Sequence, residues 1–170
     1  MNGDVQIKLL PPSPAVTKTP DRVTPKTIQP SKPEFAISAS ASVTVQLRPQ
    51  WVWHRLNDPC NWAEFLGHLS SVTKSSFDMD EYTWSVGNQH CPIRLTVREP
   101  PLHLAWQSLA GQPLQLSGEI ILEPLEWYTQ LTIRLHYLTD DPQLNASLQV
   151  LEAELQRDMT AMAQVLGKSS

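Results

Sequence analysis

The chain of 170 residues has only two cysteines and no long hydrophobic run. Cys60 and Cys91 are too few for a disulfide framework and do not form a metal-type pair, so we expect free thiols in a reducing compartment. No apolar run approaches the roughly 18 residues that a membrane-spanning helix requires, and the first residues lack the compact apolar block of a secretory signal. These absences favour a cytoplasmic protein and leave peripheral association with a membrane open.

Positive charge is also scarce outside the first 33 residues, which hold 7 of the 15 prolines. This segment has few large apolar side chains, so residues 1–36 are predicted to form a disordered tail. The tail carries a net charge of +3 and the whole chain −4, which leaves −7 on the rest. An acidic body argues against nucleic acid as a partner. The tail has three alternative roles: a linker, a docking segment for an anionic surface, or a cleaved targeting peptide.

The segment of residues 144–166 shows a strong helical period. Its apolar residues recur every three or four positions, in one stripe: Leu144, Leu148, Leu151, Leu155, Met159, Met162 and Leu166. Neither proline nor glycine interrupts it, while Pro142 precedes it and Gly167 follows it. A helix this apolar on one side requires a large partner surface, so we predict one long helix packed on a sheet.

Strand patterns dominate the residues before this helix. Residues 37–47 alternate apolar and polar side chains, which predicts a strand with one polar face. Two short helices follow, one at residues 49–56 and one capped by Asn61. Further strands are predicted at residues 82–86, 93–98, 102–108, 116–123 and 129–139. This order predicts an α+β domain over residues 37–167, in which an antiparallel meander curls around the C-terminal helix and leaves a gap as the site.

The strand face that meets the helix is almost entirely apolar. Only Ser108 and Tyr137 are polar on that face. The charged side chains of these strands fall on the outward face: Arg94, Arg98, His103, Glu119, Glu123, Arg134 and His136. General acid–base catalysis needs such a group beside the substrate, so this pattern disfavours an enzyme.

Several short motifs together resemble a known family. They are Val52-Trp53, Leu56-Asn57-Asp58, Asn61-Trp62, Phe65, Leu104-Ala105-Trp106-Gln107-Ser108, Gly111, Gly118, Pro124, Thr129 and Tyr137. Their order resembles the START-like superfamily of polyketide cyclases/dehydrases, coenzyme Q-binding proteins and Bet v 1-type proteins. The resemblance implies a helix-grip fold, in which a curved antiparallel sheet wraps around a long C-terminal helix and encloses a cavity for a lipid, quinone or polyketide. It does not imply one activity, because this fold hosts both carriers and enzymes.

The expected ligand contacts come from the two short helices, from the inward face of the strands and from the apolar stripe of the C-terminal helix. They are Trp53, Phe65, Trp84, Trp106, Ser108, Tyr137, Leu151, Leu155 and Met159. Tyr137 with Ser108 could orient a carbonyl or quinone oxygen, although a buried tyrosine often satisfies its hydroxyl locally and aromatic residues are often simply core. The histidines and cysteines have no ligand-type spacing, so we expect neither a metal nor a cofactor.

The turn at Trp127 and Tyr128 places two aromatic residues at a hairpin tip. Exposed aromatic tips serve partner surfaces or membrane interfaces; alternatively, they fold back on the sheet. The leading prediction is a non-enzymatic carrier or chaperone for a quinone, lipid or isoprenoid. One alternative is an assembly protein with a filled cavity that docks on a protein complex through its tail and this tip. The other is a cyclase or aromatase.

Overall fold

The computed structural model describes residues 34–75 and 78–168, so residues 1–33 of the predicted tail lie outside the described residues. Seven strands and four helical segments follow one another along the described chain. In order they are β1 (Phe35–Val45), α1 (Pro49–Leu56), the 3₁₀ helix η2 (Pro59–Glu64), β2 (Leu69–Lys74), β3 (Glu81–Val86), β4 (Gln89–Glu99), β5 (His103–Ser108), β6 (Leu114–Leu125), β7 (Tyr128–Thr139), α2 (Pro142–Leu148) and α3 (Leu151–Lys168).

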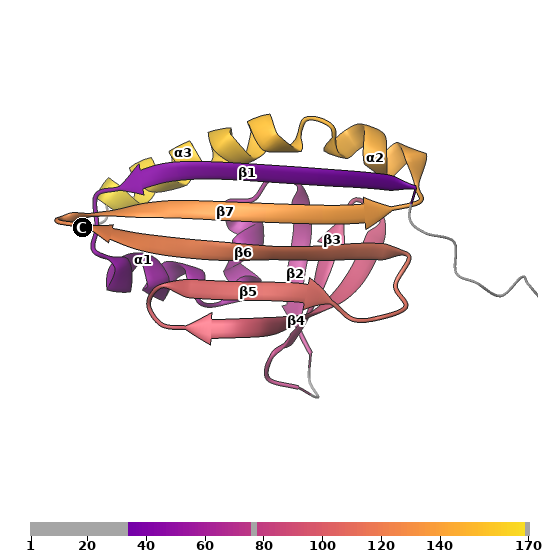
Figure 1. Cartoon of the computed structure of the whole chain (residues 1–170), viewed down its shortest axis with the longest axis horizontal. Coiled ribbons are helices and arrows are strands. Elements are labelled where there is room, and N and C mark those ends of the chain that lie inside the picture. Colours follow the sequence, from indigo (N-terminus) through magenta and orange to yellow (C-terminus); the bar gives the residue numbers. More distant parts are fainter. Residues whose placement is uncertain (1–33, 76–77, 169–170) are drawn as a thin grey trace, which may run out of the picture. The chain divides into compact units, whose positions relative to one another are not determined.

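The seven strands form one antiparallel sheet in the order β1-β7-β6-β5-β4-β3-β2. Strands β3 to β7 are the predicted meander, and β2 extends it at one edge. Strand β1 joins the other edge by pairing with the last strand, so that Ile37 lies opposite Tyr137. The sheet curls until β2 and β3 lie behind β5 and β6 in Figure 1, while α2 and α3 run along β1. The predicted α+β class, curved sheet and pair of short helices after the first strand are confirmed.

The C-terminal helix differs from its prediction in one respect. It consists of α2 and α3, with a break at Gln149 and Val150, although neither proline nor glycine stands there. The backbone N–H of Gln149 bonds to the carbonyl of Ala146, three residues back, and its side-chain amide bonds to Asn145. This tightened last turn ends α2, while all seven residues of the apolar stripe remain buried. The prediction of one continuous helix was therefore wrong, although that of one apolar face was right.

Two local predictions near the start of the domain also need correction. Strand β2 was missed because its sequence does not alternate: a register shift between Leu69 and Ser71 leaves Leu69 and Val72 as its buried residues. The second short helix is capped by Asp58, whose side chain accepts from the N–H of Cys60, and not by Asn61.

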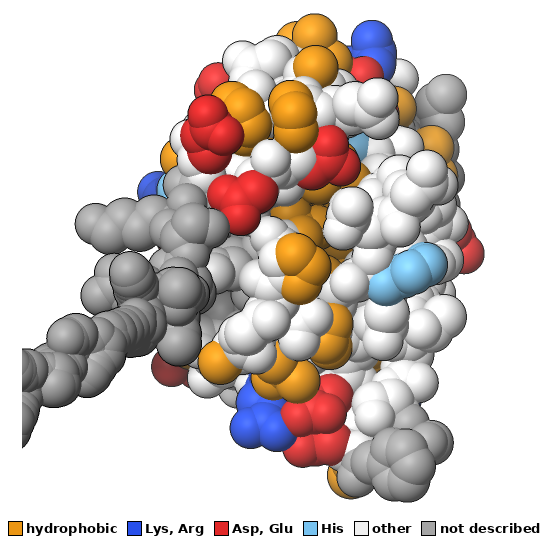
Figure 2. Space-filling view, turned by 90° about the vertical axis from the view of Figure 1, so that its right-hand side faces the viewer, with side chains coloured by type: hydrophobic (Ala, Val, Ile, Leu, Met, Phe, Trp, Pro, Cys, Tyr) orange, Lys and Arg blue, Asp and Glu red, His pale blue; other side chains and the backbone are white. Residues whose placement is uncertain are grey.

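The hydrophobic core lies between the concave face of the sheet and the apolar stripe of α2 and α3. At the end of the molecule that carries α2, hydrophobic side chains are visible as a strip between polar regions (Figure 2). None of the helices in the described part has both the length and the hydropathy that crossing a bilayer requires.

Candidate functional site

Three tryptophans from different elements fill the middle of the space between sheet and helix. Trp62 comes from η2, Trp84 from β3 and Trp106 from β5. The Trp62 and Trp106 rings lie 4.6 Å apart, and Trp84 lies 5.5 Å from Trp62 and 5.6 Å from Trp106, measured between ring centroids. Each is at most 2% exposed. Two aromatic residues of the predicted site, Trp84 and Trp106, therefore pack against each other and against Trp62 as core.

A glycine makes room for one of these rings. Gly118 of β6 lies opposite Trp106 in the sheet. A Cβ atom at position 118 would lie 2.5 Å from Cζ2 of Trp106 and 2.8 Å from the carbonyl oxygen of Arg134. Real Cβ contacts are longer, so the Trp106 ring can lie flat over this strand only because residue 118 lacks a side chain.

A buried histidine–tyrosine pair stands beside the tryptophans. The Nε2 atom of His68 lies 2.7 Å from the Oη atom of Tyr137. Burial lowers the pKa of His68 to about 4, and the carboxylate of Asp158 opposes this shift. Burial raises the pKa of Tyr137 above its ordinary value, and the indole N–H of Trp84 opposes that rise. Near pH 7 the pair is therefore a neutral imidazole and a neutral phenol.

Asp158 of α3 connects this pair to the surface. Its Oδ2 atom accepts a hydrogen bond of 2.9 Å from the backbone N–H of Gly67, the residue before His68. The carboxylate thereby holds the segment between η2 and β2 against α3. Its negative charge also favours the protonated form of His68, against the effect of burial.

The indole N–H groups of the three tryptophans have different partners. Nε1 of Trp62 donates to the carbonyl oxygen of Leu56 at 2.9 Å, and the N–H of Trp84 acts on the Tyr137 hydroxyl. Nε1 of Trp106 has no acceptor among the described residues, which is unusual for a buried donor.

A groove of about 530 Å³ lies beside α3, and Asp158 is part of its lining. Its volume falls in the range of small-molecule pockets. The apolar part of its lining belongs to α1, η2's end and α3: Leu56, Phe65, Ala161, Met162, Val165 and Leu166. Its polar part consists of Arg55, Asn61, Glu64 and Asp158. Leu56, Met162 and Leu166 also belong to the core, so the floor of the groove is the edge of the interior.

The nine residues predicted to contact a ligand occupy different positions around this interior. Phe65 lines the groove and is half-buried. Eight of them belong to or pack against the buried core or the pair described above: Trp53, Phe65, Trp84, Trp106, Tyr137, Leu151, Leu155 and Met159. Ser108 lies at the end of β5, where its Oγ atom accepts from the backbone N–H of Leu116 at 3.1 Å. Tyr137 bonds to His68 instead, so each hydroxyl of the predicted pair has its own partner.

Sequence reasoning missed His68, which was weighed only as a metal ligand. It precedes the missed strand β2, so no alternation pattern assigned it a face. The available signal was the apolar residues Leu66, Leu69 and Val72, which are three positions apart and lie on both sides of His68. All three are buried in the core.

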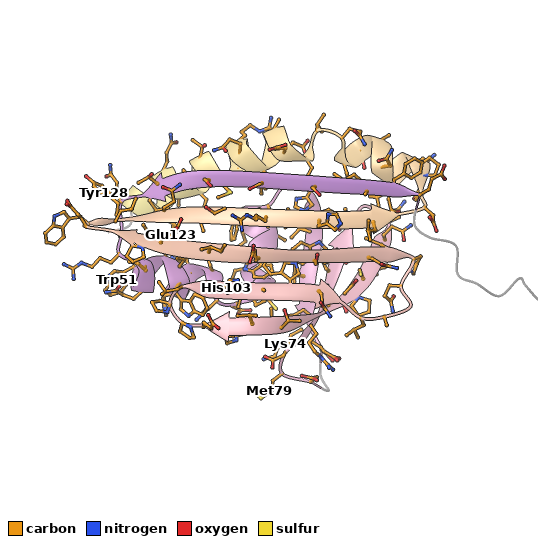
Figure 3. All side chains as sticks on the ribbon, viewed as in Figure 1. Trp51, Lys74, Met79, His103, Glu123 and Tyr128 are labelled. Atoms are coloured by element: carbon orange, nitrogen blue, oxygen red, sulfur yellow. The ribbon has the colours of Figure 1, made fainter. Side chains whose placement is uncertain are left out.

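The outward face of the sheet carries most of the charged side chains predicted to lie there. The prediction was wrong for Arg98, because a register shift between Leu95 and Val97 places Arg98 opposite the buried Leu104, and its Nη1 atom donates to the carbonyl of Asn57 after α1. Glu119 bonds to Nε2 of His103 at 2.9 Å and to Nη1 of Arg134 at 2.8 Å, and the Arg134 bond lowers the pKa of Glu119. Figure 3 shows His103 and Glu123 on this face. A shallow hollow of about 580 Å³ on it is lined largely by serine and charged side chains, and it lies apart from the interior.

The predicted aromatic tip is exposed. Leu125 pairs with Tyr128, so Glu126 and Trp127 form a two-residue turn, with a left-handed backbone at Glu126 (φ 41°). The exposed fractions are 66% for Trp127 and 43% for Tyr128. The guanidinium of Arg48 lies 5.1 Å from the centre of the Trp127 ring. Trp51 of α1 is also exposed at this end of the molecule (Figure 3).

Comparisons with known proteins bear on the fold. No protein-family model and no curated protein matches the sequence. Among solved structures, a protein of Deinococcus radiodurans has a TM-score of 0.68 at 20% identity, over 79% of this chain and 99% of that one. A protein of Thermus thermophilus has a TM-score of 0.57 at 13% identity, over 78% and 95% of the two chains.

One neighbour with an activity in its name is the ZhuI aromatase/cyclase of Streptomyces sp. R1128. Its TM-score is 0.54 at 19% identity, over 79% of this chain and 93% of that one. At such identities the likeness concerns the fold and not the activity. The described part of this chain has the helix-grip fold that the sequence resemblance implied.

Proposed function

We propose that this protein binds a hydrophobic small molecule, such as a quinone, a lipid or an isoprenoid, and acts as its carrier or chaperone. The observation that carries the proposal is the groove of about 530 Å³ beside α3, whose apolar floor is the edge of the core. The fold adds support, because its superfamily binds hydrophobic ligands. The proposed ligand contacts are Trp53, Phe65, Trp84, Trp106, Ser108, Tyr137, Leu151, Leu155 and Met159.

The charge state of the interior indicates a neutral ligand. His68 is uncharged near pH 7, because burial holds its pKa at about 4. Tyr137 keeps its proton, since burial raises its pKa. An anionic group that entered beside this pair would find no cation to balance it, whereas an uncharged apolar molecule loses little hydration there.

The test is native mass spectrometry of the purified protein, followed by organic extraction of any bound molecule. We expect an excess mass that extraction assigns to a quinone, lipid or isoprenoid. Ala161→Trp should reduce the bound fraction, because Ala161 lines the groove and a large side chain there would fill it.

Ala153→Trp is the matched control, since Ala153 is an exposed alanine of the same helix outside the groove lining. Equal loss of ligand from both variants would contradict the groove as the binding site. A protein without any extractable molecule, which also retains no added quinone or lipid, would overturn the proposal.

The His68–Tyr137 pair favours a second candidate, a cyclase or aromatase activity. An enzyme of this class needs a general acid or base beside the substrate, and a histidine bonded to a tyrosine can supply either role. The structural likeness to an aromatase/cyclase agrees with this candidate. The test is turnover of a polyketide substrate by the wild type and by Tyr137→Phe. If this variant loses turnover and still retains the ligand, the result favours the enzyme over the carrier function.

The filled interior and the exposed tip favour a third candidate, an assembly protein. Trp62, Trp84 and Trp106 occupy space that a ligand would need, and Trp127 and Tyr128 offer an aromatic contact surface. Trp127→Ala should then abolish association with a protein complex or a membrane while the fold persists. Unchanged association in this variant would contradict docking through the tip.

A further inference from the structure

Four large hydrophobic side chains are exposed at one end of the molecule, and we call them the tip surface. Trp51 of α1 is 60% exposed. The other three belong to the β6–β7 hairpin: Leu125, Trp127 and Tyr128, with exposed fractions of 44%, 66% and 43%. Figure 3 shows Trp51 and Tyr128 at the same end of the sheet. Apolar side chains that gather at the surface in this way mark a site of interaction.

Contacts between α1 and the hairpin hold the tip surface in a fixed arrangement. The Thr129 hydroxyl donates a hydrogen bond of 2.6 Å to the carbonyl oxygen of Leu47. The guanidinium of Arg48 lies 5.1 Å from the centre of the Trp127 ring. Both contacts are made just before α1, the helix that carries Trp51. A surface that is already ordered loses little conformational entropy when it binds.

The chemistry of the tip surface matches the boundary between the hydrocarbon and the headgroups of a bilayer. Tryptophan and tyrosine combine an apolar ring with a polar N–H or O–H group, and they are enriched at this boundary. The segment of α1 contributes Arg48 and Arg55, and the hairpin contributes Glu123 and Glu126, so two positive charges balance two negative ones. The chain after residue 33 carries −7, so this end is neutral within an acidic body and is not repelled by a negative membrane surface.

The groove of the proposed ligand site lies beside the tip surface. Arg55 lines the groove and stands one helical turn after Trp51, on the same face of α1. On the α3 side of the groove, Val165 is 63% exposed. This end of α3 lies close to the end of β1, because a Cβ atom on Gly167 would lie 4.0 Å from the Cβ of Gln46. A bilayer that contacts the tip surface is therefore next to the groove.

We propose that the tip surface docks on a phospholipid bilayer and places the groove at the surface of the membrane that holds the ligand. This inference rests on the proposed function, because quinones, lipids and isoprenoids partition into membranes. Burial of the Trp51 and Trp127 rings at the headgroup level supplies the free energy of docking. Docking therefore does not depend on anionic lipid.

The test is flotation of the full chain with vesicles of pure phosphatidylcholine, a zwitterionic lipid. We expect the double variant Trp51→Ala, Trp127→Ala to bind these vesicles at least about tenfold more weakly, because it removes both rings. An increase in NaCl from about 0.05 M to about 0.5 M should change the affinity of the wild type by less than about twofold, since salt screens charges and not apolar burial.

Met79→Ala is the control, because Met79 is 79% exposed and lies away from Trp51 and Tyr128 in Figure 3. This variant should bind the vesicles as the wild type does. A second measurement uses the wild type alone. Trp51 and Trp127 are exposed, while the other four tryptophans are at most 8% exposed. Brominated phosphatidylcholine, which quenches indoles on contact, should therefore quench only part of the tryptophan fluorescence.

Three results would overturn the inference: no binding to phosphatidylcholine vesicles, binding that requires anionic lipid, and equal binding by the wild type and the double variant. Native mass spectrometry tests the proposed function separately, because it needs no bilayer. A protein that retains a ligand and ignores vesicles would contradict docking and leave the proposed function standing. A protein that binds vesicles and retains no ligand would support docking and contradict the proposed function.

Discussion

Nε2 of His68 and Oη of Tyr137 lie 2.7 Å apart in the interior, although 69 residues separate them in the sequence. His68 follows the 3₁₀ helix η2, and Tyr137 belongs to the last strand of the sheet. Their rings meet edge to face, with centroids 5.8 Å apart. The bond therefore joins the segment that borders the groove to the strand that pairs with β1.

Tyr137→Phe should destabilise the protein by about 1–3 kcal/mol, because it leaves a buried imidazole nitrogen without its partner. Urea unfolding followed by circular dichroism measures the loss. Tyr128→Phe is the control, since this tyrosine is exposed at the hairpin tip and its change should stay within about 0.5 kcal/mol. A Tyr137→Phe variant as stable as the wild type would show that the bond contributes nothing to stability.

His68 should make the stability of the protein pH-dependent. Burial lowers its folded-state pKa to about 4, below the 6.5 of an exposed histidine, so the unfolded chain takes up the proton first as the pH falls. The stabilisation from neutral His68 is complete above about pH 6.5 and is lost as the pH falls toward 4, by roughly 3 kcal/mol in all.

The measurement is the free energy of unfolding between pH 7.5 and 4.5 for the wild type and for His68→Gln. The two proteins share their carboxylates, so the difference between their curves isolates His68. We expect the wild type to lose its advantage across this window, and parallel curves would contradict the assigned shift. Asp158→Asn should lower the pKa of His68 further, because it removes the carboxylate that opposes the effect of burial.

Gly118→Ala should cost about 1–3 kcal/mol, because its methyl group would overlap the Trp106 ring and the Arg134 carbonyl. Gly167→Ala is the matched control, since its nearest contact is an ordinary 4.0 Å to the Cβ of Gln46. Thermal unfolding of both variants compares the two positions. Equal melting temperatures of the two variants would mean that the Trp106 ring moves aside without loss of stability.

Trp127→Ala should change the free energy of unfolding by less than about 1 kcal/mol, because the ring is 66% exposed and its contact with Arg48 is a surface cation–π interaction. Trp53→Ala provides the contrast, since Trp53 is a core residue and its loss should cost about 3–5 kcal/mol. Chemical denaturation of both variants measures the difference. A large loss in Trp127→Ala would assign the tip to the fold and not to docking.

The parts of the fold that periodicity encodes were predictable from the sequence. Alternation in residues 37–47 and 129–139 indicated β1 and β7, and the stripe from Leu144 to Leu166 indicated the buried face of α2 and α3. Strand β2 was not predictable in this way, because its two buried residues, Leu69 and Val72, are three positions apart, a spacing typical of a helix. A register shift between Leu69 and Ser71 lets a strand bury residues at this spacing. The break at Gln149 is made by hydrogen bonds of a single turn, which leave the apolar spacing unchanged.

The site was less predictable than the fold, because it depends on pairs that are distant in sequence. Tyr137 was assigned to the inward face, but its partner His68 lies in a connecting segment that carries no period. The unpaired state of the Trp106 N–H group depends on what surrounds its ring in three dimensions. The sequence identified Trp62 and Trp106 alike as aromatic core residues, and only the fold shows that Trp62 has an acceptor and that Trp106 has none among the described residues.

The pairing of β1 with β7 also has a consequence for synthesis on the ribosome. β1 is an early segment of the chain, yet every partner of its 11 residues lies between Thr129 and Thr139. At roughly 5–20 residues per second, the nascent strand waits roughly 5–20 s for the segment that pairs with it. During that time β1 has neither a charged residue nor a proline to prevent other strands from pairing with it, so its unpaired backbone groups are open to association until β7 has been made.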